Sequence, residues 1–150
     1  MSNVMISFAS VDDVDQILRL EDQLEKDRYS KEIIESSIIA DNYINLVAKI
    51  DGVIVGYLSA SLVLDECSLL KIVTSLENRR QGVANMLIDN LEEYLCKRDI
   101  RVVMLEVRTD NIAAINLYKK TGFRLDGVRK KYYIDCDAEL YSKELNGKRN

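Results

Sequence analysis

A short loop that contains two arginines, a glutamine and a glycine precedes a predicted helix and has the residue types to hold phosphate oxygens. Its residues are Arg79, Arg80, Gln81 and Gly82. Gly82 carries no Cβ, so another group can approach its backbone closely. The first turn of a helix leaves several N–H groups without intrahelical partners, and the helix dipole favours anions there. The loop therefore predicts a pyrophosphate site, although a polar turn before a surface helix would use the same residues.

The segment after this loop has the pattern of an amphipathic helix. Its apolar residues recur at spacings of three and four positions, and polar residues fill the other side. The apolar stripe consists of Ala84, Leu87, Ile88, Leu91 and Leu95. The first residues of this helix, from Val83 to Asn85, therefore have free N–H groups to offer an anion.

The chain contains no histidine, and this is the strongest exclusion that its composition makes. A Ser-His-Asp triad, a Cys-His pair and an imidazole-bound metal are all excluded. A general base must be a carboxylate, a tyrosine, a lysine, a cysteine or a water held by one of them. The cysteines, Cys67, Cys96 and Cys136, are odd in number and far apart. We therefore predict neither a metal site nor a disulfide framework.

The length and composition of the chain are typical of a soluble globular protein, and we expect residues 1–150 to form one domain. Hydrophobic residues make up 47% and charged residues 31% of the chain. The net charge of −4 gives no support for nucleic-acid binding. No apolar run reaches the length of a membrane span, and the first residues lack the features of a signal peptide. We therefore expect a cytoplasmic protein with neither a nucleic-acid nor a membrane partner.

Hydrophobic periodicity and turn residues predict a mixed α/β order. One strand is followed by two helices, which Ser10 and Ser30 can cap, and then by three strands. An Asp51-Gly52 turn joins the first two of those three. A helix, a strand, a helix that Gly122 ends, and two closing strands complete the order. The expected strands span residues 4–9, 43–50, 53–64, 67–74, 100–107, 123–128 and 138–145.

The helix after the arginine loop lies between the predicted strands 67–74 and 100–107. If this helix is a crossover connection, the two strands are parallel. The loop then lies at the carboxyl end of the first strand, where open α/β sheets bind ligands. Gly56 predicts a bulge in the strand that comes before this pair.

Several motifs together resemble the GNAT superfamily of acetyl-CoA-dependent N-acetyltransferases. The acyl-CoA loop of that family reads Arg/Gln-x-x-Gly-x-Gly/Ala, and residues 79–84 fit it. The other matching segments are Leu64-Asp65-Glu66, Leu105-Glu106-Val107-Arg108, Asn111, Ala113-Ala114, Leu117-Tyr118, Gly122-Phe123 and Arg129-Lys130-Lys131-Tyr132-Tyr133. As a set they are similar to the RimI-like branch, the ribosomal-protein-alanine N-acetyltransferases, over roughly residues 4–145.

The resemblance implies a GNAT fold, with a mixed sheet that is splayed between its fourth and fifth strands and flanked by helices. Acetyl-CoA would bind in the gap as a co-substrate, without a metal. The residues implied to bind it are Ile72, Val73, Thr74, Arg79, Arg80, Gln81, Gly82, Val83, Ala84, Asn85, Asn111 and Tyr118. The N–H of Val73 would hold the developing oxyanion. Asn111 would contact the coenzyme, or would only cap the helix that follows it.

The resemblance also implies the residues that carry the chemistry. Glu106 would act as general base on the acceptor amine, through a water, and an α-amino group with a pKa of roughly 8 needs only a modest base. Tyr118 would protonate the departing thiolate, or at least donate a hydrogen bond to the sulfur. Without the family, Glu106 is an outward-facing residue at a strand end and Tyr118 a packing residue.

The acceptor is predicted to be a protein N-terminus or another peptide, with a ribosomal protein as one candidate. Tyr29, Tyr132 and Tyr133 match aromatic positions at the family's peptide site, although ordinary strand aromatics would look the same. Residues 28–30 depart from the family's Pro-Trp-Ser type segment, which leaves the ribosomal acceptor open. Two alternatives remain: a GNAT enzyme that acts on a small amine or a lysine side chain, and a non-catalytic acyl-CoA-binding partner subunit.

Overall fold

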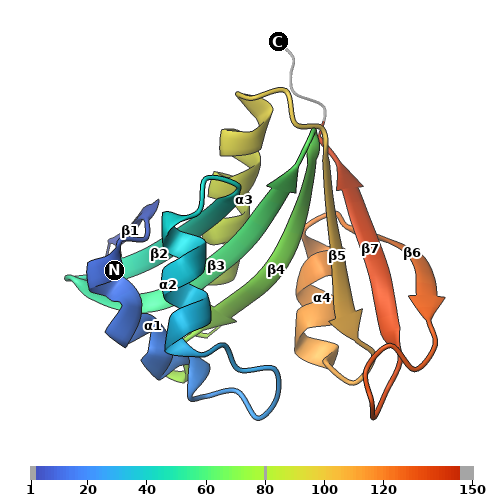
Figure 1. Ribbon diagram of the computed structural model, residues 1–150, viewed down its shortest axis with the longest axis horizontal. Coiled ribbons are helices and arrows are strands. Elements are labelled where there is room, and N and C mark those ends of the chain that lie inside the picture. The colour runs from blue at the N-terminus through green and yellow to red at the C-terminus, as the bar shows by residue number, and fades with distance from the viewer. Residues whose placement is uncertain (1–2, 80, 146–150) are drawn as a thin grey trace.

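A computed structural model describes residues 3–79 and 81–145 and shows a strongly twisted sheet with helices on both faces (Figure 1). The strands lie in the order β1-β2-β3-β4-β5-β7-β6. Their bounds are β1 Val4–Phe8, β2 Tyr43–Ile50, β3 Val53–Val63, β4 Glu66–Thr74, β5 Val102–Arg108, β6 Arg124–Arg129 and β7 Ala138–Glu144. The helices are α1 Val14–Glu21, α2 Lys31–Ile39, α3 Val83–Cys96 and α4 Ile112–Lys120, and short 3₁₀ segments span Val11–Asp13 and Leu76–Asn78.

The predicted caps and turns form as their residue types require. Ser30 accepts a hydrogen bond from the N–H of Ile33 at the start of α2. Asp51 and Gly52 have φ of 51° and 81°, which is the double left-handed conformation that a two-residue hairpin needs. A register shift between Ala48 and Lys49 lies opposite the chain at Gly56, where we predicted a bulge.

Some element ends differ from the predictions. The helix after Ser10 begins as a 3₁₀ turn, and α1 ends at Glu21, before the apolar Leu24. Strand β5 begins at Val102, because the N–H of Ile100 donates to the carbonyl of Leu95 and so belongs to the end of α3. Local hydrophobicity does not distinguish these ends from their neighbours.

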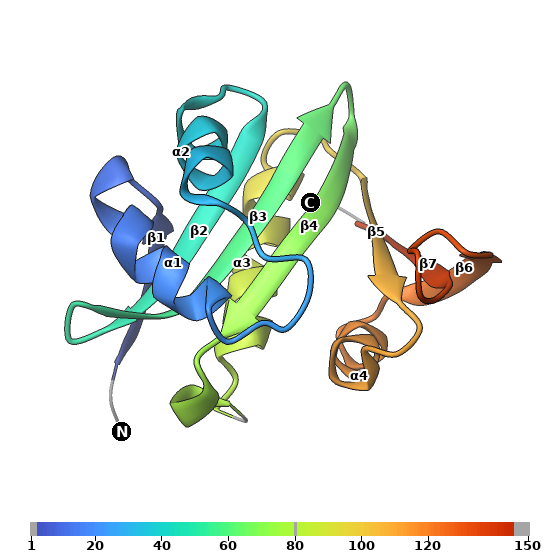
Figure 2. The same ribbon diagram turned by 60° about the horizontal axis from the view of Figure 1, so that its bottom comes forward.

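Strands β4 and β5 are parallel, as predicted, but they pair over a short distance. Partners are recorded for residues 66–68 of β4 with residues 102–104 of β5, and both strands then continue without pairing to each other. The sheet is therefore splayed at this point, and Figure 2 shows β4 and β5 diverging toward their carboxyl ends. This confirms the splay between the fourth and fifth strands that the family resemblance implied.

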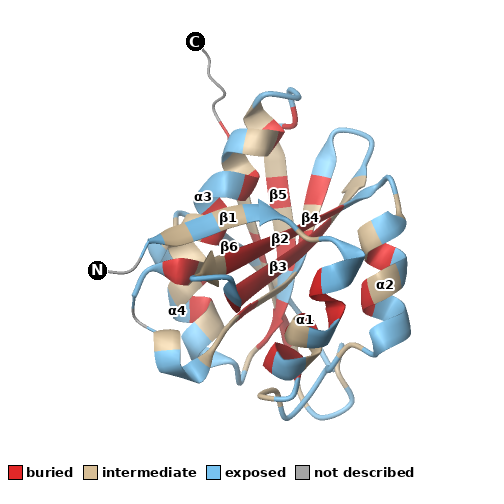
Figure 3. Ribbon diagram, turned by 90° about the vertical axis from the view of Figure 1, so that its left-hand side faces the viewer, coloured by how far each residue is buried: buried red, intermediate tan, exposed pale blue. Residues whose placement is uncertain are grey.

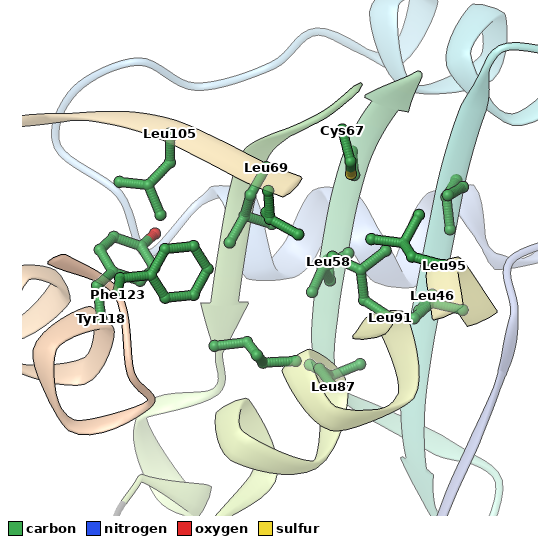
Figure 4. Close-up of a cluster of buried hydrophobic side chains, with 14 of the residues drawn as sticks. Leu46, Leu58, Cys67, Leu69, Leu87, Leu91, Leu95, Leu105, Tyr118 and Phe123 are labelled. Carbon is green, nitrogen blue, oxygen red and sulfur yellow. The ribbon is translucent and has the colours of Figure 1, made fainter. Parts of the chain in front are cut away.

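The sheet separates two hydrophobic clusters. The smaller one packs α1 and α2 on one face, with Ile17, Ile34, Tyr57 and Val73 among its members. The larger one packs α3 and α4 on the other face, and Figure 4 shows the leucines of α3 meeting those of β2, β3 and β4. Figure 3 shows that burial is concentrated on β2 and β3, between these layers. In the described part of the chain, no helix is long and apolar enough to cross a membrane.

Gly56, on β3, lies directly under the first turns of α3. A Cβ at this position would lie 2.7 Å from Cγ1 of Val83, a contact too short for real carbon atoms. Glycine at position 56 therefore lets the first turn of α3 pack directly against β3. That contact places the start of α3, and with it the arginine loop, beside the end of β4.

Candidate active site

A cavity of about 600 Å³ opens at the splay between β4 and β5. It is lined by Asp27, Tyr29, Ser68, Leu69, Leu70, Lys71, Met104, Leu105, Glu106, Asp126, Arg129, Tyr132, Tyr133, Leu140 and Tyr141. The lining residues come from the loop between α1 and α2, from both diverging strands and from the β6–β7 region. The cavity therefore lies between segments that are far apart in the sequence.

Glu106 is the carboxylate of β5 that lines this cavity. Its side chain is 33% exposed, and its Oε2 lies 3.2 Å from Nη1 of Arg129, on β6. The guanidinium of Arg129 also lies 4.9 Å from the centre of the Tyr132 ring. Glu106 is therefore open to an incoming group, and Arg129, which the sequence analysis noted only as part of a motif, already pairs with it.

The three predicted acceptor tyrosines meet at the same cavity as Glu106. Tyr29 lies between α1 and α2, whereas Tyr132 and Tyr133 lie between β6 and β7. The rings of Tyr132 and Tyr133 meet edge to face with 5.1 Å between their centres. Burial raises the pKa of Tyr133 to about 12, so this phenol stays neutral at physiological pH. The tyrosines thus form an aromatic wall beside the carboxylate.

Tyr118 lies behind this cavity, on α4, and is not among the residues that line it. It is 7% exposed and packs edge to face on Phe123, with 5.7 Å between the ring centres. Figure 4 shows its hydroxyl directed toward Leu105, on β5. Burial raises its pKa above the ordinary tyrosine value, because the phenolate would lose its hydration. Tyr118 is therefore a neutral hydrogen-bond donor that is held in the core next to the splay.

The hydrogen-bond pattern of β4 changes the predicted oxyanion donor, the N–H of Val73. Val73 pairs with Tyr57 of β3, and the N–H of Ser75 donates to the carbonyl of Val55 at 2.8 Å. Bonded pairs alternate in an antiparallel ladder, so the N–H of Val73 also faces β3 and not the splay. The N–H groups of Ile72 and Thr74 face the splay instead. The oxyanion donor predicted at Val73 is therefore better assigned to one of its neighbours.

The loop before α3 has the geometry of an anion cradle in the part that is described. Gly82 has a φ of 80°, and a Cβ built on it would meet nothing within 4 Å, so the space above it is open. The first intrahelical bond of α3 runs from Met86 to the carbonyl of Gly82. The N–H groups of residues 83–85 have no partner among the described residues. Arg79 and Gln81 are exposed beside them, while the predicted contact of Arg80 lies outside the described residues.

Asn111 performs the simpler of its two predicted roles. Its side-chain oxygen accepts a hydrogen bond of 3.1 Å from the N–H of Ala114, and it therefore caps α4. No other hydrogen bond or ion pair of this side chain is found within the described residues, and its contact with the coenzyme stays a prediction.

Lys71 and Glu21 form a buried ion pair beside the cavity that the sequence analysis missed. Nζ of Lys71 lies 2.8 Å from Oε1 of Glu21, and the two side chains are 9% and 2% exposed. The same ammonium donates to the carbonyl of Asp27 at 2.6 Å and lies 3.7 Å from the centre of the Tyr29 ring. Burial lowers the pKa of Lys71, and Glu21 opposes that shift. The pair fixes the α1–α2 loop against β4.

A second charged network joins the α1–α2 loop, the end of β5 and the β6–β7 loop behind Tyr133, whose ring centre lies 5.0 Å from the guanidinium of Arg108. Arg108, at the end of β5, makes two hydrogen bonds of 3.0 Å to Asp110 and one of 2.7 Å to Asp135. Lys26, from the α1–α2 loop, lies 2.7 Å from the same Asp135. The hydrogen bond from Arg108 holds the pKa of Asp135 below its usual range. Since residues 26, 108 and 135 are distant in sequence, no local motif could have indicated this contact.

Comparison with known proteins shows which family this chain belongs to. The model of the Acetyltransferase (GNAT) family matches residues 11–123. The [ribosomal protein bS18]-alanine N-acetyltransferase of Escherichia coli (strain K12) is 34% identical over 98 residues, which are 65% of this chain and 66% of that protein. The putative enzyme of the same name from Bacillus subtilis (strain 168) is 30% identical over 83% of each chain.

Solved structures show the same fold. The ribosomal-protein-S18-alanine N-acetyltransferase from Escherichia coli superposes with a TM-score of 0.86 at 28% identity, over 95% of this chain and 94% of that one. Arabidopsis thaliana NAA60 in complex with acetyl-CoA has a TM-score of 0.86 at 20% identity, over 97% of this chain and all of that one (100%). Within the described residues, no group of histidine, cysteine or acidic side chains is arranged to hold a metal ion.

Proposed function

The chain belongs to the acetyltransferase (GNAT) family, and from that premise we propose that it transfers an acetyl group from acetyl-CoA to the α-amino group of a protein N-terminus. One observation carries the proposal: Glu106 and the tyrosines at 29, 132 and 133 line one cavity at the splay of the sheet. The relatives named for acetylation of ribosomal protein bS18 support the same acceptor class.

The donor side of the site fits a CoA thioester. The open space above Gly82 and the N–H groups of residues 83–85, which have no partner among the described residues, suit a pyrophosphate. Within residues 3–79 and 81–145, the edge of β4 beyond Ser68 has no strand partner on the side of β5, so its amides are available to a pantetheine chain and an acetyl carbonyl. When bound, acetyl-CoA supplies the acetyl group as an activated thioester.

The acceptor side of the site supplies a general base, Glu106, and an aromatic surface made by the three tyrosines. An α-amino group is mostly protonated at neutral pH, and Glu106 can take its proton directly or through a water. The guanidinium of Arg129 must move away from Glu106 before the amine can approach the carboxylate as closely as Arg129 does now. The tyrosine wall holds the first residues of the acceptor beside the carboxylate.

Tyr118 acts on the leaving group as a hydrogen-bond donor. Burial raises its pKa well above that of a CoA thiol, so complete proton transfer from the phenol to the thiolate runs uphill. A hydrogen bond from the neutral phenol stabilises the developing negative charge without that transfer. The buried position of Tyr118 therefore favours the second of its two predicted roles.

The acceptor within this class is proposed to be a ribosomal protein N-terminus, because the two curated relatives named above carry that substrate in their names. The test is to incubate the protein with acetyl-CoA and separate panels of N-terminal peptides, polyamines and aminoglycosides, and to follow release of free thiol. Turnover with peptides supports the proposal, whereas turnover only with small amines overturns it. Binding of CoA without turnover on any panel would instead indicate a non-catalytic partner subunit.

A further inference from the structure

A second cavity, of about 460 Å³, lies beside the first on the face of the sheet that α2 covers. It is lined by Tyr29, Glu32, Ile33, Ser36, Ser37, Ala40, Tyr43, Ser59 and Leu70. Tyr29 and Leu70 also line the cavity that contains Glu106. The two cavities are therefore neighbours that share one wall, and a single chain can pass from one to the other over that wall.

One buried polar atom marks the floor of the second cavity. Ser59, on β3, is 1% exposed, and its hydroxyl oxygen has no hydrogen-bond partner within residues 3–79 and 81–145. A hydroxyl that is removed from water without a partner is unfavourable, and native proteins usually satisfy such groups. This oxygen is closed off from the cavity, since its own accessible area is below 1 Å², and a ligand in the cavity therefore meets the other lining side chains.

The rim of the second cavity is apolar and carries one unpaired carboxylate. Ile33 is 51% exposed and Leu70 is 42% exposed. Glu32, which also lines the cavity, takes part in none of the ion pairs found among the described residues. The cavity thus presents apolar contact and a negative charge to one occupant.

The shared wall is rigid. Tyr29 lies under the ammonium of Lys71, at 3.7 Å from its ring centre, and its N–H donates to the buried carboxylate of Glu21 at 3.0 Å. A residue that is held at its ring and at its backbone keeps the two cavities at a constant separation. An occupant of both must therefore have a fixed spacing between its reacting end and its second anchor, as an extended peptide has.

We propose that the second cavity is a subsite for the acceptor polypeptide, and that it takes a side chain from a residue downstream of the N-terminus. The side chain it fits has an apolar stem and a hydrogen-bond donor at its end, ideally a cation that can face Glu32. This inference rests on the proposed function, because it assumes that the amine at Glu106 belongs to a peptide.

The first test compares acceptor lengths. A dipeptide reaches the cavity of Glu106 alone, whereas an octapeptide with the same first residues and one lysine, moved through successive positions, also reaches the second cavity. We expect one lysine position to raise kcat/KM about tenfold over the dipeptide, a gain typical of an added contact in a pocket. Equal kcat/KM for the dipeptide and for every octapeptide would overturn the subsite while leaving the proposed function intact.

The second test blocks the subsite. Ile33→Arg should bring kcat/KM for the preferred octapeptide to within about twofold of the dipeptide value, because the new side chain fills the cavity mouth. Ile39→Arg is the matched control, since Ile39 is a 73% exposed isoleucine of the same helix that does not line the cavity. An octapeptide preference that survives Ile33→Arg in a folded protein would overturn the proposal.

Glu32→Gln keeps the proposal falsifiable if the arginine variant does not fold. Glu32 makes no ion pair among the described residues, so we expect Tm to stay the same. We expect kcat/KM for the preferred lysine octapeptide to fall about fivefold, because the amide cannot attract the ammonium group. An unchanged lysine preference would count against the subsite. If the wild-type protein acetylates neither peptide, the proposed function itself fails.

Discussion

Nη1 of Arg129 lies 3.2 Å from Oε2 of Glu106, so the carboxylate assigned to the acceptor amine is already paired with a cation of the same chain. The side chains are 55% and 33% exposed, and a pair this open contributes little to stability. The pair matters because the guanidinium of Arg129 and the acceptor amine compete for the same carboxylate oxygen. The resting site is therefore neutralised until an acceptor displaces Arg129.

Replacing Glu106 tests the base directly. We expect Glu106→Gln to lower kcat by about 10²-fold or more, because the amide cannot accept the proton of the amine. The affinity for acetyl-CoA, measured by calorimetry, should change little, since Glu106 lies on the acceptor side. Unchanged turnover would remove Glu106 from the mechanism.

Replacing Arg129 tests the competition. We expect Arg129→Met to lower KM for the acceptor peptide about threefold and to flatten its dependence on salt, because an exposed ion pair is weak and screened. The control is Lys130→Met, since Lys130 is the next residue and pairs with Asp137 at 3.4 Å instead. A higher KM for Arg129→Met would show that Arg129 binds the acceptor.

The pH dependence of the reaction tests Tyr118. The phenol must be protonated to donate a hydrogen bond, and burial raises its pKa, so its protonated form persists above the ordinary tyrosine range. We expect kcat/KM to rise with pH up to about 8, as the acceptor amine loses its proton, and to stay level to about pH 10. A fall in rate between pH 8 and about pH 10 that is absent from Tyr118→Phe would contradict the assignment.

The same tyrosine can be tested by substitution. We expect Tyr118→Phe to lower kcat about tenfold to a hundredfold while the protein stays folded, because the ring still packs on Phe123. Tyr94→Phe, on α3, is the control for loss of a tyrosine hydroxyl elsewhere. Equal kcat for the two variants would leave Tyr118 with a packing role.

Gly82 and Gly52 have nearly the same backbone conformation, so alanine variants of the two can distinguish backbone strain from an effect on acetyl-CoA binding. Gly82 and Gly52 have φ of 80° and 81°, and neither has an atom within 4 Å of a built Cβ. We expect Gly82→Ala and Gly52→Ala each to lower the free energy of unfolding by about 1 kcal/mol, through the left-handed conformation. Only Gly82→Ala should also weaken acetyl-CoA binding, about fivefold or more by titration. Equal coenzyme affinity in both variants would argue against the cradle.

Local patterns in the sequence predicted the order of the elements, the Asp51-Gly52 turn and the helix that begins after Gly82. Each of these depends on residues that lie within a few positions of one another. Caps, turns and helix periodicity are set by backbone dihedrals and by near-neighbour contacts, which the residue types specify.

Contacts between distant segments were decided only by the tertiary structure. The family resemblance implied that three tyrosines would contact the acceptor. Only the structure shows that the short pairing of β4 with β5 opens a cavity, and that Tyr29 and Tyr132 line it together with Glu106. The direction of the Val73 amide follows from its register with β3, which the sequence of β4 does not contain. The same holds for the pairing of Lys71 with Glu21 and of Arg129 with Glu106. Register and strand divergence result from packing the whole sheet between its two helical layers, and no local stretch of sequence specifies them.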